Sequence, residues 1–252
     1  IPTGNTPSTH IIKPPIKDVA DSVHNEFFCM ALAQEVGLPT AEAAIYWLAE
    51  TPYYLTKRYD RLTSTKGTTT RLHQEDFCQA MGIPPDHKYQ NEGGPSLAAC
   101  FTLLDGFIHQ GQMPGMSKLT LLRGVLFNIL IGNGDAHGKN FSVLYRDEGV
   151  FLAPFYDLLC TIVYSNIYKN KMAMKIGTKY KFNALHLRHF EALAGEIGVK
   201  PAMVTKELKK LAAILPEKAT ELAHNLSKKS EYKSDVYQDI LNTIQRQCRH
   251  FR

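Results

Sequence analysis

The chain has 252 residues, of which 44% are apolar and 21% are charged. That length and composition can bury one large core or two modest ones, and they exclude a disordered chain. No segment approaches the roughly 18 uninterrupted apolar residues that a membrane span requires. The formal net charge of +5 permits contact with phosphate-bearing partners without requiring it.

Two features predict the cellular compartment. Residues Ile1–His10 are polar and contain Pro and Gly, so they lack the basic head and apolar centre of a secretory signal. The five cysteines are widely spaced and form no C-x-x-C pair, which argues against a zinc site or a disulfide framework. They are Cys29, Cys78, Cys100, Cys160 and Cys248. We therefore expect free thiols in a cytoplasmic protein that does not associate with membranes.

The first sixty residues alternate β-like runs with one helix. Thr9–Lys13 is rich in β-branched residues and is followed by two prolines, which a central strand could not contain. Asp21 and Ser22 then offer a cap for an amphipathic helix that ends at Gly37. Two further β-like runs predict a hairpin, Ile45–Leu48 with Tyr53–Thr56.

After residue 70 the pattern is mainly helical. Ser117 is placed to cap a helix that is apolar on nearly every side and is therefore expected at the centre of the core. A β-hairpin interrupts the helices, with arms at Phe141–Tyr145 and Val150–Ala153. Further helices are predicted at 187–198, 201–215, 216–227 and 234–250, with Pro201 and Pro216 near helix starts. The fold class is thus α+β, with a small mixed α/β lobe over residues 1–60 and a large, mainly helical lobe over residues 61–252.

The segment Ile131–Asn140 carries the most chemical information. Its three glycines end the preceding apolar helix in a loop that offers Asp135 and Asn140 and leads directly into the hairpin. The far arm of the hairpin leads to Asp157. Because a hairpin returns its two ends to one place, we expect these three side chains to converge in one site.

Two carboxylates and an amide suit phosphoryl transfer. Mg²⁺ prefers oxygen ligands and usually takes one or two carboxylates together with substrate phosphates. The Asp135–Asn140 spacing is that of the kinase catalytic loop, in which the aspartate orients the attacking hydroxyl and the asparagine holds metal. Asp157 would supply the metal carboxylate. The alternative is that these residues only form turns or cap a helix.

A lysine and a linker complete this hypothesis. Lys13 follows two isoleucines on a β-like run, and Glu26 on the first helix is a candidate anionic partner, as in the lysine–glutamate pair of kinases. The alternative is an edge lysine that points to water. Segment 57–59, which is Lys57, Arg58 and Tyr59, would present backbone groups to an adenine edge, or serve only as a charged connector.

Several short segments, in order, resemble the HipA family of bacterial toxin serine/threonine kinases. Each is weak alone, and their order along most of the chain makes the resemblance specific. They are His10–Pro14, Asn25–Cys29, Lys57–Arg61, Gln74–Gln79, Lys88-Tyr89 before Gly93–Pro95, Gly134–Ser142 and Pro154–Asp157.

The resemblance implies a two-lobed, kinase-like fold and ATP- and Mg²⁺-dependent phosphorylation of a protein serine or threonine. In the best-known members the target is an aminoacyl-tRNA synthetase, so that translation is inhibited and growth stops. A small helix-turn-helix antitoxin, HipB-like, would join the kinase to operator DNA. The implied roles are Lys13 on the ATP phosphates, Lys57, Arg58 and Tyr59 at the adenine, Asp135 as catalytic base, Asn140 and Asp157 on Mg²⁺, and His137, Lys139 and Tyr156 lining the nucleotide site.

The chain departs from the family pattern in three ways. It begins within the family's small lobe, so the preceding Gly/Ser loop that covers the phosphates is not in this sequence. Lys57 stands at a linker position that often holds glutamate. The segment 169–181 contains five lysines and no acid, but it is shorter than the stretch that meets DNA in the best-known member. It is either a weak DNA contact or a solvated basic loop.

Two other functions compete with the toxin kinase. A small-molecule phosphotransferase of the antibiotic-kinase type shares the Asp135–Asn140 spacing, although the Gln74–Gln79 and Gly93–Pro95 stretches argue against it. A non-catalytic, kinase-like module could act through an antitoxin on DNA, although the intact acids argue against loss of catalysis.

Overall fold

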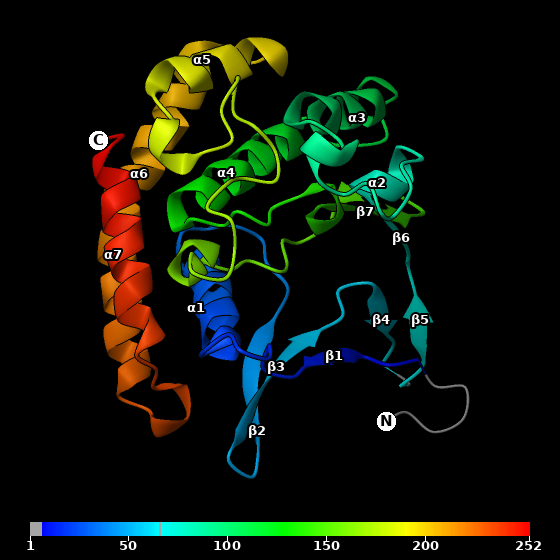
Figure 1. Cartoon of the computed structure of the whole chain (residues 1–252). Coiled ribbons are helices and arrows are strands. Elements are labelled where there is room, and N and C mark those ends of the chain that lie inside the picture. Colours follow the sequence, from blue (N-terminus) through cyan, green and yellow to red (C-terminus); the bar gives the residue numbers. More distant parts are fainter. Residues whose placement is uncertain (1–6, 66) are drawn as a thin grey trace.

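The computed structural model describes residues 7–65 and 67–252. Most of the polar stretch that opens the sequence therefore lies outside the described residues. The chain forms three small antiparallel sheets and seven α-helices over these residues, with short 3₁₀ turns between them (Figure 1).

The first sheet has the strand order β1-β3-β2. It confirms the strand predicted within Thr9–Lys13 and the hairpin predicted from the two following β-like runs. It contains β1 (His10–Lys13), β2 (Ala43–Leu48) and β3 (Thr51–Lys57). In the register of the central strand, Tyr54 lies between Lys13 on one side and Ile45 on the other. Tyr54 is almost completely buried, so it forms a floor beneath the Lys13 side chain.

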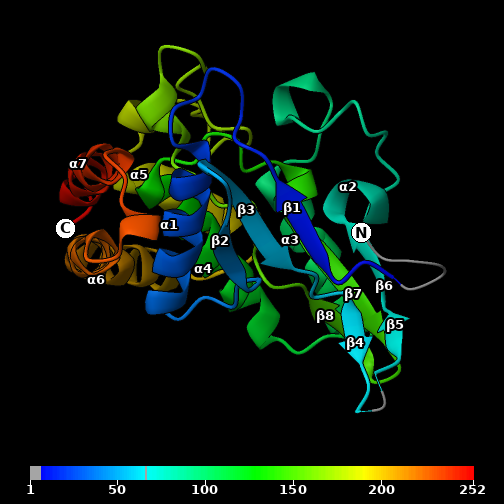
Figure 2. The ribbon, with the colours of Figure 1, turned by 90° about the horizontal axis from the view of Figure 1, so that it is seen from below.

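Helix α1 (Ser22–Glu35) packs against β2 and β3 on one side and against the C-terminal helices α6 and α7 on the other, as Figure 2 shows. The predicted cap of this helix is wrong. Asp21 is in the left-handed region and makes no capping bond. Its carboxylate instead accepts a hydrogen bond from Ser234, and Ser22 Oγ accepts one from the Ile16 N–H. Both side chains hold neighbouring segments to the start of the helix.

The second and third sheets follow the linker after β3. Strands β4 (Arg61–Thr63) and β5 (Thr69–Arg71) form a short ribbon. Strands β7 (Ser142–Arg146) and β8 (Gly149–Leu152) are the hairpin that the sequence predicted. Its first arm also pairs with β6 (His73–Asp76), a strand that was not predicted. This pairing fixes the hairpin beside segment 131–140.

The helical part is built around α4 (Met116–Ile131), which is buried along most of its length, as the sequence predicted. Ser117 is not its cap, because the helix begins one residue earlier, after Gly115. The other helices are α2 (Phe77–Ala80), α3 (Leu97–His109), α5 (Leu187–Glu196), α6 (Pro201–Ser227) and α7 (Val236–Arg249). The 3₁₀ turns are η1 (Gln90–Glu92), η2 (Gly138–Asn140), η3 (Thr161–Tyr164), η4 (Phe182–Ala184) and η5 (Ser230–Tyr232).

Helix α6 corrects the predicted break at Pro216. The helix runs without interruption from residue 201 to 227, with Pro216 inside it. A proline inside a helix has no N–H for the carbonyl four residues earlier. Here that carbonyl belongs to Ala212, and it accepts a hydrogen bond from Arg252 Nε at 3.2 Å. A tertiary donor thus replaces the missing backbone donor.

Two expectations of composition can be checked. All five cysteines are free and buried. Within the part of the chain that is described, none of the helices combines the length and apolar character that a membrane crossing needs.

Candidate active site

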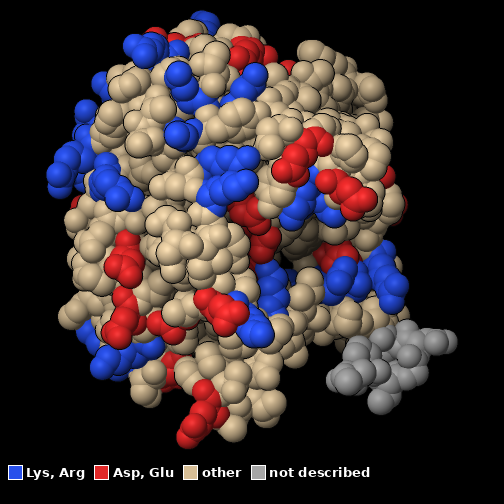
Figure 3. Space-filling model, viewed as in Figure 1, with Lys and Arg blue, Asp and Glu red and all other residues tan. Residues whose placement is uncertain are grey.

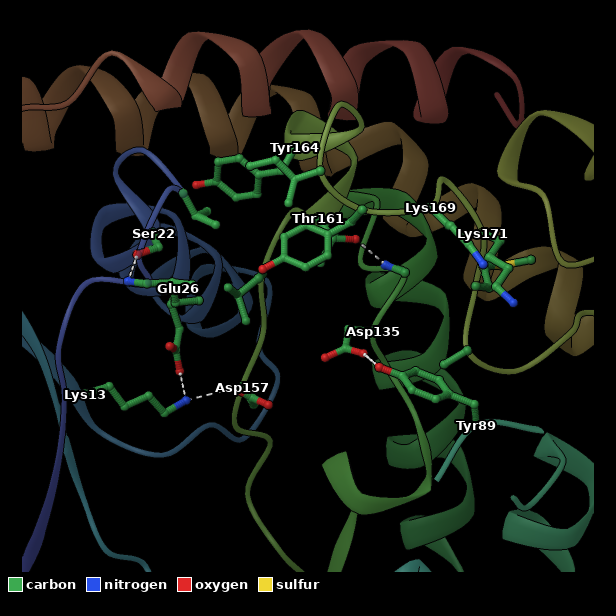
Figure 4. A pocket seen from close by; sticks show the side chains of 18 of the residues that line it. Lys13, Ser22, Glu26, Tyr89, Asp135, Asp157, Thr161, Tyr164, Lys169 and Lys171 are labelled. Carbon is green, nitrogen blue, oxygen red and sulfur yellow. Dashed lines mark hydrogen bonds and ion pairs between the residues drawn. The ribbon is translucent and has the colours of Figure 1, made fainter. Parts of the chain in front are cut away.

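Lys13 reaches the site from the end of β1 and joins two acidic side chains. Its Nζ lies 2.7 Å from Glu26 Oε1 and 2.7 Å from Asp157 Oδ1. The ammonium group also stands over the Tyr54 ring, 5.3 Å from its centroid. Figure 4 shows the lysine extended between the two carboxylates. The structure thus brings together three of the residues that the sequence selected.

Burial and the neighbouring opposite charge act in opposite directions on the pKa values of Lys13 and Glu26. Burial, reinforced by the nearby charge of Asp157, raises the pKa of Glu26 to about 7, although Lys13 acts to lower it. The pKa of Lys13 is also raised, because the two carboxylates outweigh the effect of its own burial. Lys13 therefore stays protonated at neutral pH, while the charge of Glu26 is sensitive to what surrounds it.

Asp157 is held by anchors on both sides. Before it, Phe155 exchanges backbone hydrogen bonds with residues 39–41 after α1, through Pro39 O and the Ala41 N–H. After it, the backbone of Cys160 exchanges two hydrogen bonds with the side chain of Asn25 on α1. Between these anchors Asp157 takes a left-handed conformation with φ of 59°. Such a conformation is costly for a non-glycine residue and is common at functional sites.

Asn140 binds the same carboxylate from the loop before β7. Its Nδ2 donates to Asp157 Oδ2 at 2.6 Å, and its Oδ1 accepts from the His137 N–H at 3.1 Å. The two oxygens of Asp157 therefore face two partners, Lys13 from β1 and Asn140 from the loop before β7. The β7–β8 hairpin lies between Asn140 and Asp157 in the sequence and returns the chain, so that these two residues meet.

Asp135 is presented by the loop after α4. Gly132 ends that helix in a left-handed conformation, with φ of 78°. A chain of amides then shapes the turn: Asn133 Nδ2 donates to Asn128, and Asn133 Oδ1 accepts the Asp135 N–H at 3.1 Å. The carboxylate of Asp135 lines a cavity that also borders Lys13 and Asp157, and it accepts a hydrogen bond from Tyr89.

His137 is buried behind Asp135. Its Nε2 lies 4.0 Å from Asp135 Oδ1, and its ring meets Tyr89 edge to face. Burial lowers the pKa of His137, although the charge of Asp135 acts to raise it. The imidazole is therefore mainly neutral at pH 7, and it contributes to the site as a packed polar ring.

Two cavities meet at the Lys13 group. One has a volume of about 630 Å³ and includes Asp135 and Tyr89 in its lining. The other, of about 230 Å³, lies toward the linker after β3. Lys13, Glu26, Tyr54 and Asp157 line both. On the face shown in Figure 3, acidic and basic side chains stand side by side around a hollow in the surface.

The residues expected at the nucleotide base lie around the smaller cavity. Tyr59 and Tyr156 stack with their ring centroids 5.8 Å apart. The Tyr156 hydroxyl donates to the backbone carbonyl of Lys139 at 2.7 Å. The N–H groups of Lys57 and Arg58 are taken up by the carbonyls of Glu42 and Thr9. The lining includes Lys57, Arg58, Tyr59, Lys139 and Tyr156. His137 and Asn140 stand behind the surface and reach the site through Asp135 and Asp157.

Sequence reasoning did not select Gln74, Asp60 or Tyr89, which line these cavities. Gln74 on β6 lines the smaller cavity, and its buried Oε1 has no partner among the described residues. Asp60 accepts hydrogen bonds from both Arg58 and Arg61 and fixes the linker. Tyr89 binds Asp135. All three residues stood inside motifs that the sequence analysis quoted, but no local pattern indicates which cavity a motif faces.

The donor set at Asp157 fits Mg²⁺ in chemical type. A carboxylate and an amide oxygen leave most of an octahedral shell to water and substrate phosphates, as this ion prefers. In the present arrangement Asn140 turns its amide nitrogen toward Asp157, so its oxygen would have to rotate into the site. No group of three or more His, Cys, Asp or Glu side chains within residues 7–65 and 67–252 is arranged to hold a metal.

Solved structures identify the fold class. HipA of Shewanella oneidensis, in a complex of the toxin–antitoxin pair HipA and HipB with operator DNA, matches with a TM-score of 0.83 and 26% identity. That match covers 96% of this chain and 58% of the HipA chain. The proinflammatory kinase CtkA of Helicobacter pylori matches in fold, with a TM-score of 0.61 at 14% identity over 95% of this chain and 84% of CtkA. The protein has a kinase-like α+β fold.

The family follows from sequence. Residues 2–225 match the HipA-like C-terminal domain family, and the chain belongs to it. It is 38% identical over 239 residues to a protein of Sinorhizobium fredii named "Putative kinase Y4mE", covering 95% of this chain and 54% of that protein. It is 28% identical over 227 residues to the serine/threonine-protein kinase toxin HipA of Shewanella oneidensis, covering 87% of this chain and 52% of the toxin. The chain thus spans about half the length of these two relatives.

Proposed function

We propose that this protein is a kinase that transfers the γ-phosphoryl group of ATP to a hydroxyl group. The observation that carries the proposal is that Lys13 and Asn140 both bind the carboxylate of Asp157, which lines a cavity that Asp135 also lines. A cation, a carboxylate–amide pair and a second carboxylate facing a cavity are the groups that phosphoryl transfer requires.

The nucleotide is assigned to the smaller cavity and its junction with the larger one. In this proposal the adenine lies beside the stacked rings of Tyr59 and Tyr156, next to segment 57–59. Lys139 lines the same cavity. Lys13, at the junction, binds the phosphates as a fixed cation, and Glu26 holds it in place. Because the N–H groups of Lys57 and Arg58 are already bonded, the base would be read by other backbone groups of the linker.

Asn140 and Asp157 would hold Mg²⁺, which when bound neutralises charge on the phosphates. In the arrangement without metal, the His137 backbone N–H holds Asn140 through its Oδ1, and this bond would be given up when that oxygen turns to the metal. The 2.6 Å contact between Asn140 and Asp157 keeps the two ligands together before any metal is bound.

Asp135 is the proposed catalytic base. It orients the acceptor hydroxyl and accepts its proton as the new P–O bond forms and the bond from the γ-phosphorus to the ADP oxygen breaks. Nearly half of its side chain is exposed, at 46%, so an acceptor in the larger cavity can reach it.

The finer proposal concerns the acceptor and the partners. We propose a serine or threonine of a protein as acceptor, an aminoacyl-tRNA synthetase as that protein, and inhibition of translation as the result. The serine or threonine acceptor is supported by the relative named a serine/threonine-protein kinase toxin, whereas the synthetase and the inhibition of translation are what the family resemblance implies. A HipB-like helix-turn-helix antitoxin is the proposed partner, supported by the similarity to HipA in its complex with HipB and operator DNA. We also propose that segment 169–181 makes a weak contact with DNA. The boundary between the small and large lobes is proposed at residue 60.

The test is transfer of labelled phosphate from ATP by the protein expressed from its complete gene. Asp135→Ala should abolish transfer, because the acceptor hydroxyl loses its base, while the far-ultraviolet circular dichroism stays that of the parent protein. Labelling of a bacterial lysate then identifies the protein acceptor. A variant that retains full activity would refute the assignment of Asp135, and transfer to aminoglycosides but to no protein would favour a small-molecule kinase.

A further inference from the structure

The contact between Tyr89 and Asp135 is separate from the nucleotide and metal contacts of the proposed kinase site. Tyr89 Oη donates to Asp135 Oδ1 at 2.6 Å. The two residues come from different segments, Tyr89 from the loop before α3 and Asp135 from the loop after α4. Figure 4 shows the phenol pointing at one oxygen of the carboxylate while the other oxygen faces away from it, into the cavity.

The loop that carries Tyr89 is closed on itself. The Tyr89 carbonyl accepts hydrogen bonds from the N–H groups of Glu92 and Gly94. Gly93 has a φ of 94°, which a side chain would strain. A Cβ at Gly94 would lie 2.7 Å from the backbone carbonyl of Lys88, so only glycine allows this approach. The two glycines thus hold the backbone of Tyr89 in one position.

The same loop is attached to two segments that flank Asp135, the turn at Gly138 and the segment 173–175. Toward the catalytic loop, Pro95 packs so closely on Gly138 that a Cβ there would lie 2.4 Å from the proline ring. Toward the far wall of the cavity, the Gln90 N–H binds Ala173 O, and Gln90 Oε1 accepts the Lys175 N–H. These contacts hold the loop in place, so the Tyr89 hydroxyl is kept directed at Asp135.

We propose that Tyr89 is a positioning residue for Asp135, holding the carboxylate through one oxygen so that the other faces the acceptor hydroxyl. This inference rests on the proposed kinase function. The described residues provide no hydrogen bond to Asp135 Oδ2, which leaves that oxygen for the substrate. Fixing a catalytic group in the productive geometry is worth large rate factors, and displacements of about 1 Å cost roughly a hundredfold.

The phenol is suited to this role over a wide pH range. Burial and the adjacent Asp135 raise the pKa of Tyr89 above its ordinary value. The hydroxyl therefore keeps its proton under physiological conditions and acts only as a donor to the carboxylate. The Lys88 ammonium lies over the Tyr89 ring, 5.0 Å from its centroid.

The test is Tyr89→Phe, which removes one oxygen and keeps the ring. We expect kcat to fall roughly ten- to hundredfold, with the KM for ATP unchanged within about twofold, since Tyr89 is on the acceptor side. The matched control is Tyr145→Phe, because Tyr145 also donates to a carboxylate, that of Glu75, at 2.5 Å. This control should keep the parent rate.

The outcomes separate this inference from the function on which it rests. If the parent protein transfers no phosphate, the kinase proposal fails. If the parent is active and Tyr89→Phe has the same kcat, only the role of Tyr89 is refuted. A faster variant would also refute it, since the phenol would then be an inhibitor that occupies the acceptor's place.

A second measurement does not depend on turnover. In a crystal structure of the Tyr89→Phe protein, the Asp135 carboxylate should rotate away from its present orientation or adopt more than one orientation. An unchanged, single orientation would show that the amide network around Asn133 positions Asp135 without the phenol.

Discussion

Lys13 and Asp157 are 144 residues apart in the sequence, yet Lys13 Nζ donates to Asp157 Oδ1 at 2.7 Å. The lysine ends a strand of the first sheet, and the aspartate follows the hairpin that begins after segment 131–140. Their contact lies where the two cavities meet. A nucleotide bound across this junction would touch both residues.

Replacing Lys13 with methionine should remove phosphoryl transfer. The variant keeps a long apolar stem but loses the cation proposed for the phosphates, so we expect activity to fall by about a hundredfold or more. Lys118→Met is the matched control, because Lys118 is also paired with a carboxylate, that of Asp105, at 2.8 Å. Initial rates with labelled ATP measure both variants, and equal loss in the two would contradict a specific role for Lys13.

Glu26 should make the stability depend on pH. Its pKa is raised from 4.5 to about 7 in the folded protein, mainly by burial. A raised carboxyl pKa means that the folded state binds more protons, so this contribution to stability is complete below about pH 4.5 and is lost as the pH rises to about 7. The loss is at most roughly 3 kcal/mol.

Glu26→Gln isolates this effect, because glutamine stays neutral. The free energy of unfolding, from urea titrations between pH 4.5 and 7.5, should fall with rising pH more steeply in the parent than in the variant. Parallel curves for the two proteins would mean that Glu26 has no raised pKa.

Asp157→Asn should change the response to Mg²⁺. The variant keeps the shape of the side chain but lacks the charge that a divalent cation requires. We expect ATP binding to strengthen with added Mg²⁺ in the parent and to be nearly insensitive to Mg²⁺ in the variant, as measured by calorimetry. Asp147→Asn, in the exposed β7–β8 turn, is the control and should respond as the parent does. An unchanged Mg²⁺ response in Asp157→Asn would exclude Asp157 as a ligand.

Arg252 should stabilise α6 at its proline. Without the Arg252 side chain the carbonyl of Ala212 loses its donor, so Arg252→Ala should lower the free energy of unfolding by about 1 kcal/mol. In a Pro216→Ala background the helix regains its own N–H, and the same arginine change should cost clearly less. Urea unfolding of the four proteins measures this difference, and equal costs in both backgrounds would show that the two sites are independent.

Part of the site could be predicted because its signals are local. The glycines of segment 131–140 end a helix whatever surrounds them, and the turn after β7 fixes the return of the chain toward Asp157. The spacing of Asp135 and Asn140 is likewise a property of one short segment. These signals rest on backbone conformation and hydrophobic period, which act over a few residues.

What the sequence determined by itself is the order of most strands and helices, the apolar centre in α4, and the return of the hairpin that brings Asp157 to Asn140. Only the tertiary structure decided that Tyr89 binds Asp135, that Gln74 lines the smaller cavity, and that α6 continues through Pro216. Each of these depends on a partner from a distant segment: a carboxylate, a cavity wall or an arginine. Such contacts follow from packing of the whole chain, because side-chain hydrogen bonds form between groups that the core brings together. They leave no repeating pattern in the sequence of either segment.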